Sequence, residues 1–206
     1  MVSRLCSSCA GALLLPQGGL EGTSPLRWWA AGFYMGAYRR ALLGLRTRPH
    51  PESIAALLMG VDPPSFPSHL SPWMVPVPSW KRKANPLPAL ICKVGGRRWR
   101  WRGADLLERS RPVLGQHHLN RAMRLENQRG AFICPRRATP REARRHPVLL
   151  VDDILTSGAT ALNAEAALRQ AGWRVHGLIC LARTPSRPYA NSGDLRCQGR
   201  AGDRPG

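Results

Sequence analysis

Two neighbouring carboxylates, followed closely by a cluster of small and hydroxyl-bearing residues, form the densest chemical pattern in this sequence. The acids are Asp152 and Asp153, and the cluster after them comprises Thr156, Ser157, Gly158, Ala159 and Thr160. Backbone N–H groups at the start of a helix bind phosphate, and hydroxyls assist them. Carboxylates accept hydrogen bonds from sugar hydroxyls or hold a metal ion. The pattern therefore predicts a site for a phosphorylated sugar.

The elements that must position this cluster are a strand, a helix and a second strand. Residues 148–151 are apolar, which is typical of a short buried strand. Apolar residues then recur at helical spacing up to Gly172, a residue that favours a helix end. Another apolar run within residues 173–182 predicts a second strand. This order indicates a right-handed βαβ unit of a parallel sheet, where ligands bind beyond the carboxyl ends of the strands.

Two alternatives to a ligand site were weighed. In the first, Asp152 and Asp153 are ordinary loop acids, and the hydroxyls of Thr156 and Ser157 only cap a helix. In the second, the two acids end the Walker B strand of a nucleotide hydrolase. That strand requires a separate Gly-x-x-x-x-Gly-Lys-Ser/Thr loop, and no lysine of this chain follows a glycine. The second alternative is therefore excluded.

The composition is strongly basic. The 206 residues carry a net charge of +19, and only three of the 31 cationic side chains are lysine. Arginine's planar fork suits phosphate, so we expect a polyanionic partner, although base composition of the gene is another source of arginine. Residues 97–145 contain fourteen arginines with Trp99 and Trp101 among them, a combination that pairs with phosphates and stacks on the bases of single-stranded DNA.

Membrane insertion is not expected, because the chain has no apolar run of about 18 residues. We therefore expect a cytoplasmic protein. Its cysteines are scattered, which argues against a disulfide framework. Cys6 and Cys9 form one Cys-x-x-Cys pair, but zinc takes four ligands and no second pair follows nearby. Zinc binding is therefore not expected.

The remaining segments give a coarse map of the chain. Residues 11–24 have the composition of a linker, residues 28–45 and 52–59 have helical patterns, and residues 103–110 suggest a short helix. Residues 73–77 predict a strand that runs into a basic turn with Ser79, Trp80 and Lys81, a second candidate anion site. Phe132 and Ile133 predict the start of an edge strand, and residues 62–72 a loop. Three regions are expected: a degenerate amino-terminal segment (1–27), a main α/β domain (28–184) and a disordered tail (185–206).

A family resemblance adds to this picture. The stretch Val-Leu-Leu-Val-Asp-Asp-Ile-Leu-Thr-Ser-Gly-Ala-Thr at residues 148–160 closely resembles the phosphoribosyl-pyrophosphate motif of type I phosphoribosyltransferases. With Val-Pro-Val-Pro at residues 75–78 and the block at residues 111–132, the chain resembles the ComF/GntX family over residues 28–184. In place of that family's Arg-Gly-Phe-Asn-Gln, residues 84–88 read Ala-Asn-Pro-Leu-Pro, and only Asn85 corresponds.

The resemblance implies a fold, a ligand and a cellular role. It implies a parallel-sheet type I phosphoribosyltransferase fold with helices on both faces, and phosphoribosyl pyrophosphate bound with Mg²⁺. Asp152 and Asp153 would face the ribose hydroxyls as the catalytic pair, Thr156 to Thr160 would hold the 5′-phosphate, and Ser79 to Lys81 the pyrophosphate. A phosphoribosyltransferase would be a glycosyltransferase, here with an unidentified acceptor. The implied role is in DNA uptake during competence. The alternative is a non-catalytic accessory that binds single-stranded DNA or a competence helicase.

Overall fold

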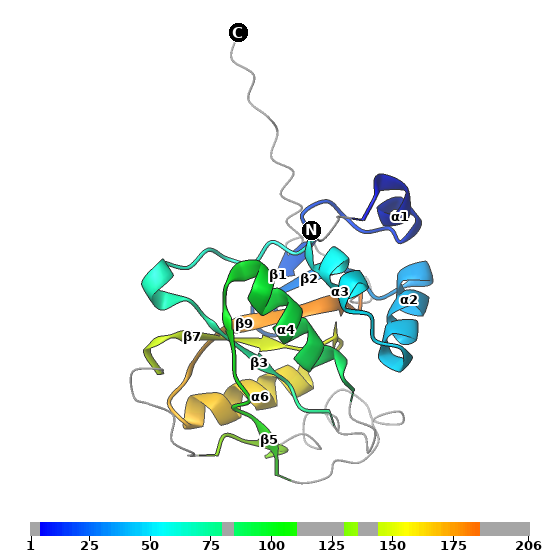
Figure 1. The fold of residues 1–206 in the computed structure, drawn as a ribbon. Coiled ribbons are helices and arrows are strands. Elements are labelled where there is room, and N and C mark those ends of the chain that lie inside the picture. The colour runs from blue at the N-terminus through cyan, green and yellow to red at the C-terminus, as the bar shows by residue number, and fades with distance from the viewer. Residues whose placement is uncertain (1–4, 80–84, 111–129, 136–143, 186–206) are drawn as a thin grey trace.

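The protein is built on a mostly parallel β-sheet (Figure 1). The computed structural model describes residues 5–79, 85–110, 130–135 and 144–185. Within them, the main sheet has seven strands in the order β1-β2-β9-β7-β3-β4, with β8 pairing to β9. Its strands are β1 (Leu20–Gly22), β2 (Trp28–Phe33), β3 (Trp73–Pro76), β4 (Arg102–Gly103), β7 (Pro147–Val151), β8 (Ile154–Leu155) and β9 (Arg174–Arg183). The β1–β2 pair is antiparallel, and the other pairs of this sheet are parallel.

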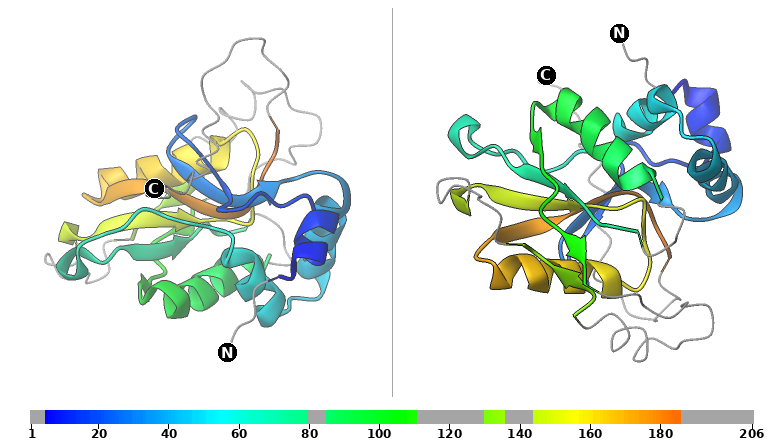
Figure 2. Two further views of the ribbon diagram at one scale, coloured as in Figure 1. Left: turned by 90° about the horizontal axis from the view of Figure 1, so that it is seen from above. Right: turned by 60° about the horizontal axis from the view of Figure 1, so that its bottom comes forward.

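Helices cover both faces of the sheet (Figure 2). One face carries α2 (Gly36–Thr47), α3 (Pro51–Leu58) and α4 (Leu87–Trp99), and the other carries α6 (Ala159–Gln170). A small antiparallel sheet of β5 (Glu108–Arg109) and β6 (Phe132–Ile133) packs on the α6 side. The other elements are α1 (Ser7–Ala12) and a 3₁₀ turn at Ser68–Leu70.

Alternation along the strands divides the apolar residues between two cores. In β7, Val148 and Leu150 face the α6 side, whereas Leu149 and Val151 face the α2–α4 side. All four are fully buried, which explains why the strand reads as a continuous apolar run. The expected α/β class with a mostly parallel sheet and helices on both faces is confirmed.

The βαβ unit predicted around the carboxylates is also confirmed. β7 and β9 are adjacent and parallel, with Leu150 opposite Leu178, and α6 connects them. The helix ends where the sequence indicated, because Gly172 adopts a positive φ of 84° just after it. The predicted strand at residues 73–77, the helix at 52–59 and the edge strand at Phe132 are present as β3, α3 and β6.

The helix predicted from residue 28 is wrong at its start. Residues Trp28–Phe33 form β2, which pairs with β9 on one side and β1 on the other, and α2 begins only at Gly36. A short apolar segment buried on both faces has no diagnostic period, so its spacing fits a helix as well as a strand. Pairing with β9, about 150 residues later in the chain, decides the outcome.

Three other segments differ from the sequence predictions. Residues 103–110 contain the end of β4 and the whole of β5 rather than a helix. The presumed linker at residues 11–24 contains the end of α1 and the whole edge strand β1. The helix α4 was not predicted, because the prolines at positions 86 and 88 and the pair Gly95–Gly96 are residues typical of loops. The prolines instead occupy the N-cap and the first turn of this helix. Within the described segments, no helix has both the length and the apolar character needed to cross a membrane.

Candidate functional site

The candidate site lies at the carboxyl edge of the parallel sheet. Asp152 and Asp153 directly follow β7, Pro78 and Ser79 follow β3, and Thr184 follows β9. These three strands are neighbours in the sheet and point the same way, so their ends meet at one edge. The structure therefore brings together the two sequence segments that were expected to bind the sugar phosphate and the pyrophosphate. Trp80 and Lys81, the other two pyrophosphate candidates, lie outside the described residues.

Asp153 is buried, and one of its carboxylate oxygens is held by two side chains. Its Oδ2 accepts a hydrogen bond of 2.5 Å from Nε of Arg46 in α2 and another of 2.9 Å from Nδ2 of Asn85. Its backbone carbonyl accepts from the N–H groups of Leu181 and Ala182 in β9. Burial alone would lower the pKa of Arg46, but the hydrogen bond and charge of Asp153 raise it. This carboxylate therefore anchors the end of β7 to the helical layer.

Asp152 has different hydrogen-bond partners from Asp153. Its Oδ1 accepts a 2.8 Å hydrogen bond from the backbone N–H of Asp153, and within the described part of the chain Oδ2 accepts none. The residue is partly exposed, yet protein surrounds its carboxyl group. Burial, and second the charge of Asp153, raise the pKa of Asp152 well above its ordinary value. Oδ2 of Asp152 and Oδ1 of Asp153 each accept no hydrogen bond from the described residues, and Asp152 is the more exposed of the two acids.

The hydroxyl-rich turn joins β8 to α6. Thr156 is exposed, Ser157 and Thr160 are half-buried, and Gly158 has a φ of 81° as the N-cap of α6. Ser157 Oγ accepts a long 3.4 Å hydrogen bond from the N–H of Ala159. The first turn of α6 contains no acidic residue, so its N–H groups and dipole keep a positive end.

The other side of this turn is closed by the amino-terminal segment. A Cβ added to Gly158 would lie 2.0 Å from Cγ of Pro25, so this close approach permits only glycine. Pro25 belongs to the segment that was expected to be a simple linker. That segment therefore helps to shape the turn, while Thr156 remains accessible on the open side.

A third charged residue, Arg109 of β5, completes the site from the α6 side. Its Nε donates a 3.0 Å hydrogen bond to the carbonyl of Pro78, and its guanidinium lies 4.6 Å from the ring centre of Phe132. Its Nη1 is buried and has no hydrogen-bond partner among the described residues. Burial lowers the pKa of Arg109, and the charge of Asp152 opposes that effect. Such a buried guanidinium N–H, close enough to Asp152 for their charges to interact, suits an anionic ligand.

The edge holds a second buried polar atom without a partner. Thr184 donates its backbone N–H to the carbonyl of Leu155 at 2.9 Å, but its Oγ1 has no partner. Together with Nη1 of Arg109, it shows that this edge has buried polar atoms that are available to a ligand or to water. Arg183, one residue earlier, donates from Nη1 to the carbonyls of Leu155 and Thr156 and so stabilises the backbone at the start of the turn.

The donor atoms at this edge fit Mg²⁺ bound through a phosphorylated ligand. Mg²⁺ is usually held by one or two carboxylates together with substrate phosphates and water. Asp152 Oδ2 and the exposed hydroxyl of Thr156 are hard oxygen donors of this kind. Among the residues that the structure describes, no three His, Cys, Asp or Glu side chains are grouped as in an all-protein metal site. Cys6 and Cys9 are exposed, and Cys6 Sγ accepts from the N–H of Cys9 at the start of α1.

Sequence reasoning missed Arg46 and Arg109. Neither residue belongs to a motif, and they lie 107 and 43 residues from the acids they influence. Asn85 was noted only as the one match within its block, and it is the residue that contacts Asp153. Comparison with known proteins gives no further guidance, since no protein-family model matches this chain and no curated protein was found to be similar to it.

Proposed function

We propose that this protein binds phosphoribosyl pyrophosphate together with Mg²⁺, as a member of the type I phosphoribosyltransferase fold related to the ComF/GntX family. The proposal rests on three features at one edge of the sheet. Among the described residues, an Asp152 oxygen and an Arg109 N–H have no hydrogen-bond partner, and a turn of the kind that binds phosphate lies at the same edge. The turn suits the 5′-phosphate and Asp152 the ribose hydroxyls. Arg109 and the end of β3 suit the pyrophosphate.

The proposed chemistry is displacement of pyrophosphate from C1 of the ribose by an unidentified acceptor. Positive charge develops on the ribose ring as the bond to pyrophosphate breaks, so positioning and electrostatics dominate catalysis. Asp152 would orient the hydroxyls and oppose the ring charge, and Arg109 would bind the leaving group. Mg²⁺ would neutralise the pyrophosphate. Asp153, whose Oδ2 is held by Arg46 and Asn85, would mainly fix the position of this edge.

The cellular setting is part of the same proposal. We place the protein in the cytoplasm, with a role in DNA uptake. The exposed free thiols of Cys6 and Cys9 agree with a reducing compartment.

Calorimetric titration with phosphoribosyl pyrophosphate, with and without Mg²⁺, tests the proposal. We expect heat that requires Mg²⁺ and falls at least about tenfold in affinity in Asp152→Asn, which removes a charge-assisted contact. The matched control is Asp62→Asn, an exposed acid in a loop far along the chain from the site. Absence of heat in the wild type, or equal affinity in Asp152→Asn, would refute the proposal.

A second candidate function is binding of single-stranded DNA, supported by a chain of aromatic contacts near the amino ends of the strands. His176 stacks on Trp29 at 6.2 Å and meets Phe66 edge-on at 4.9 Å, and Phe66 in turn meets Trp101 at 5.7 Å. Exposed arginines flank this chain: Arg27 lies over Trp29 and Arg98 over Trp99. Trp29 itself is buried, but exposed cations near the partly exposed rings of Phe66, Trp99 and Trp101 suit a nucleic acid strand.

Salt dependence tests this second function. An oligothymidylate should bind with an affinity that falls steeply as salt rises, and Arg27→Gln/Arg98→Gln should reduce the slope by about 1.4, or about 0.7 for each lost phosphate contact. The control Arg40→Gln/Arg48→Gln removes the same charge from α2 and its end. A flat salt response, or equal slopes in both double variants, would exclude this surface as the binding site.

A further inference from the structure

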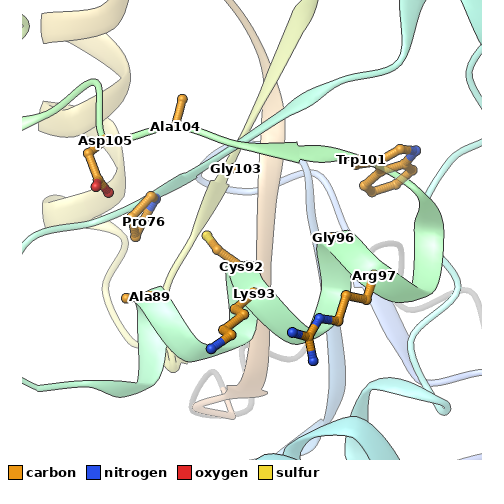
Figure 3. Close-up of a pocket in the computed structure, with 10 residues that line it drawn as sticks. All are labelled: Pro76, Ala89, Cys92, Lys93, Gly96, Arg97, Trp101, Gly103, Ala104 and Asp105. Carbon is orange, nitrogen blue, oxygen red and sulfur yellow. The ribbon is translucent and has the colours of Figure 1, made fainter.

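A cavity beside α4 has no part in the proposed binding of phosphoribosyl pyrophosphate, although its Trp101 also belongs to the aromatic chain of the second candidate function. It is an open hollow of about 500 Å³ between α4 and the chain that runs through β4 to Asp105 (Figure 3). Asp105 and Pro76 lie at one end of it and Trp101 at the other, with Cys92 and Lys93 between them. This volume is in the range of small-ligand sites in proteins.

Close backbone packing and small side chains keep this hollow open. The N–H of Trp101 donates to the carbonyl of Gly96 at 3.0 Å, and a Cβ on Gly96 would lie 2.9 Å from the carbonyl oxygen of Trp101. The chain after α4 can therefore turn back tightly against the helix. Ala89 and Gly103 then leave space between the helix and the strand.

Two cations border the cavity without any partner. Lys93 and Arg97 are exposed and stand four residues apart on α4, so both side chains extend from the same side of the helix (Figure 3). Within the described residues, neither takes part in an ion pair or hydrogen bond, and nor does Asp105 across the cavity. Like charges one turn apart repel each other, and a bound phosphate would replace that repulsion by two charge-assisted contacts.

The rest of the lining is apolar and fixed. Trp101 is half-buried and packs against Trp99 at 5.0 Å and Phe66 at 5.7 Å. Cys92 forms part of the floor, and burial, with the nearby charge of Asp105 second, raises the pKa of its thiol, which keeps it neutral. A flat ring can therefore lie over Cys92 and Pro76 with little ordering of the protein.

We propose that this cavity is a binding site for a nucleoside monophosphate, with the phosphate between Lys93 and Arg97 and an amino-bearing base directed at Asp105. The base would cover the floor at Cys92 and Pro76, and its N–H groups would donate to the Asp105 carboxylate. Trp101 closes the end nearest Arg97. The site shares no charged or hydroxyl-bearing side chain with the phosphoribosyl pyrophosphate site, so the two proposals can be tested separately.

Titration calorimetry of the full chain with guanosine 5′-monophosphate tests this site. Arg97→Gln and Asp105→Asn should each weaken binding about tenfold or more, the loss expected for one charge-assisted contact. Arg40→Gln removes the same charge from an exposed position on α2 and should change affinity less than twofold. Guanosine should bind more weakly than its monophosphate because it lacks the group for Lys93 and Arg97.

One variant separates this site from the carboxyl-edge site. The nucleotide also carries a ribose phosphate, so Asp152→Asn should retain its binding if the α4 cavity is the site. Loss of binding in Asp152→Asn but not in Arg97→Gln would assign the nucleotide to the carboxyl edge and overturn the proposal. Absence of binding by the wild type at about 1 mM ligand would also overturn it. Lys93→Gln, also at an exposed position, provides a second test should Arg97→Gln fold poorly.

Discussion

Arg46 in α2 and Asp153 at the end of β7 form an ion pair with an Nε–Oδ2 distance of 2.5 Å across 107 residues of sequence. The Asp153 side chain is 4% exposed, whereas that of Arg46 is 34% exposed. This pair, with Asn85 as the third member, connects the helical layer to the candidate site. It occupies one carboxylate oxygen of Asp153, so we expect the more exposed Asp152 to make the main contact with a ligand.

Loss of Arg46 should destabilise the fold. Arg46→Met leaves Asp153 buried with only Asn85 as a side-chain partner, and we expect a loss of about 1–3 kcal/mol, below the value for a fully buried pair because Arg46 is partly exposed. Urea unfolding measures this loss. Arg40→Met on the same helix should cost less than about 0.5 kcal/mol. The double variant Arg46→Met/Asp153→Asn should recover part of the loss, and strict additivity would contradict the coupling.

Asp152 should make stability depend on pH with a defined sign. Its pKa is raised in the folded state, so the folded protein binds more protons than the unfolded chain above about pH 4. The contribution of Asp152 to stability therefore falls as pH rises from about 4 toward its folded pKa. Asp152→Asn removes this contribution, so its stability relative to the wild type should increase across that range and then level off.

Urea unfolding at a series of pH values tests this prediction. The exposed Asp62→Asn serves as the control and should show no such trend. An Asp152→Asn difference that is constant from pH 3 to pH 8 would mean that this carboxyl group is not perturbed. A stabilised Asp152→Asn that no longer binds the sugar pyrophosphate would show that the acid is kept for binding at the expense of stability.

Two glycine-to-alanine substitutions should change the free energy of unfolding in opposite directions. Gly158→Ala places a Cβ 2.0 Å from Pro25 at a φ of 81°, so we expect a loss of about 2 kcal/mol or more together with weaker phosphate binding. Gly44→Ala in α2 meets no atom within 4 Å and should gain about 0.5–1 kcal/mol through helix propensity. Thermal unfolding of both variants provides the comparison. Equal effects would mean that Pro25 does not contact the turn in solution.

Arg109 should matter for binding more than for stability. Arg109→Met removes the unpartnered Nη1 and the bond to Pro78 while keeping the apolar contact with Phe132, so the unfolding free energy should change by only about 1 kcal/mol. Affinity for phosphoribosyl pyrophosphate should fall about tenfold or more. Arg109→Lys should recover only part of the lost affinity, since lysine lacks the planar guanidinium group that binds phosphate through two N–H groups. Unchanged affinity in both variants would remove Arg109 from the site.

Local patterns in the sequence determined the strand before the acids, the turn after them, the helix that follows and the parallel βαβ unit. These features depend on residues that are near one another in the chain, such as the apolar run of β7 and the glycines at the two ends of α6. The type of residue in the turn was enough to predict a phosphate site, and the binding itself stays a prediction.

Only the tertiary structure decided which partners each carboxylate meets. Asp152 and Asp153 are adjacent in the chain, but Asp153 is bound by Arg46 of α2 and by Asn85, whereas the charge of Asp152 acts on Arg109 of β5. These partners come from segments whose helix or strand state depends on long-range packing, as the β2 strand shows, so no local pattern could pair them with the acids.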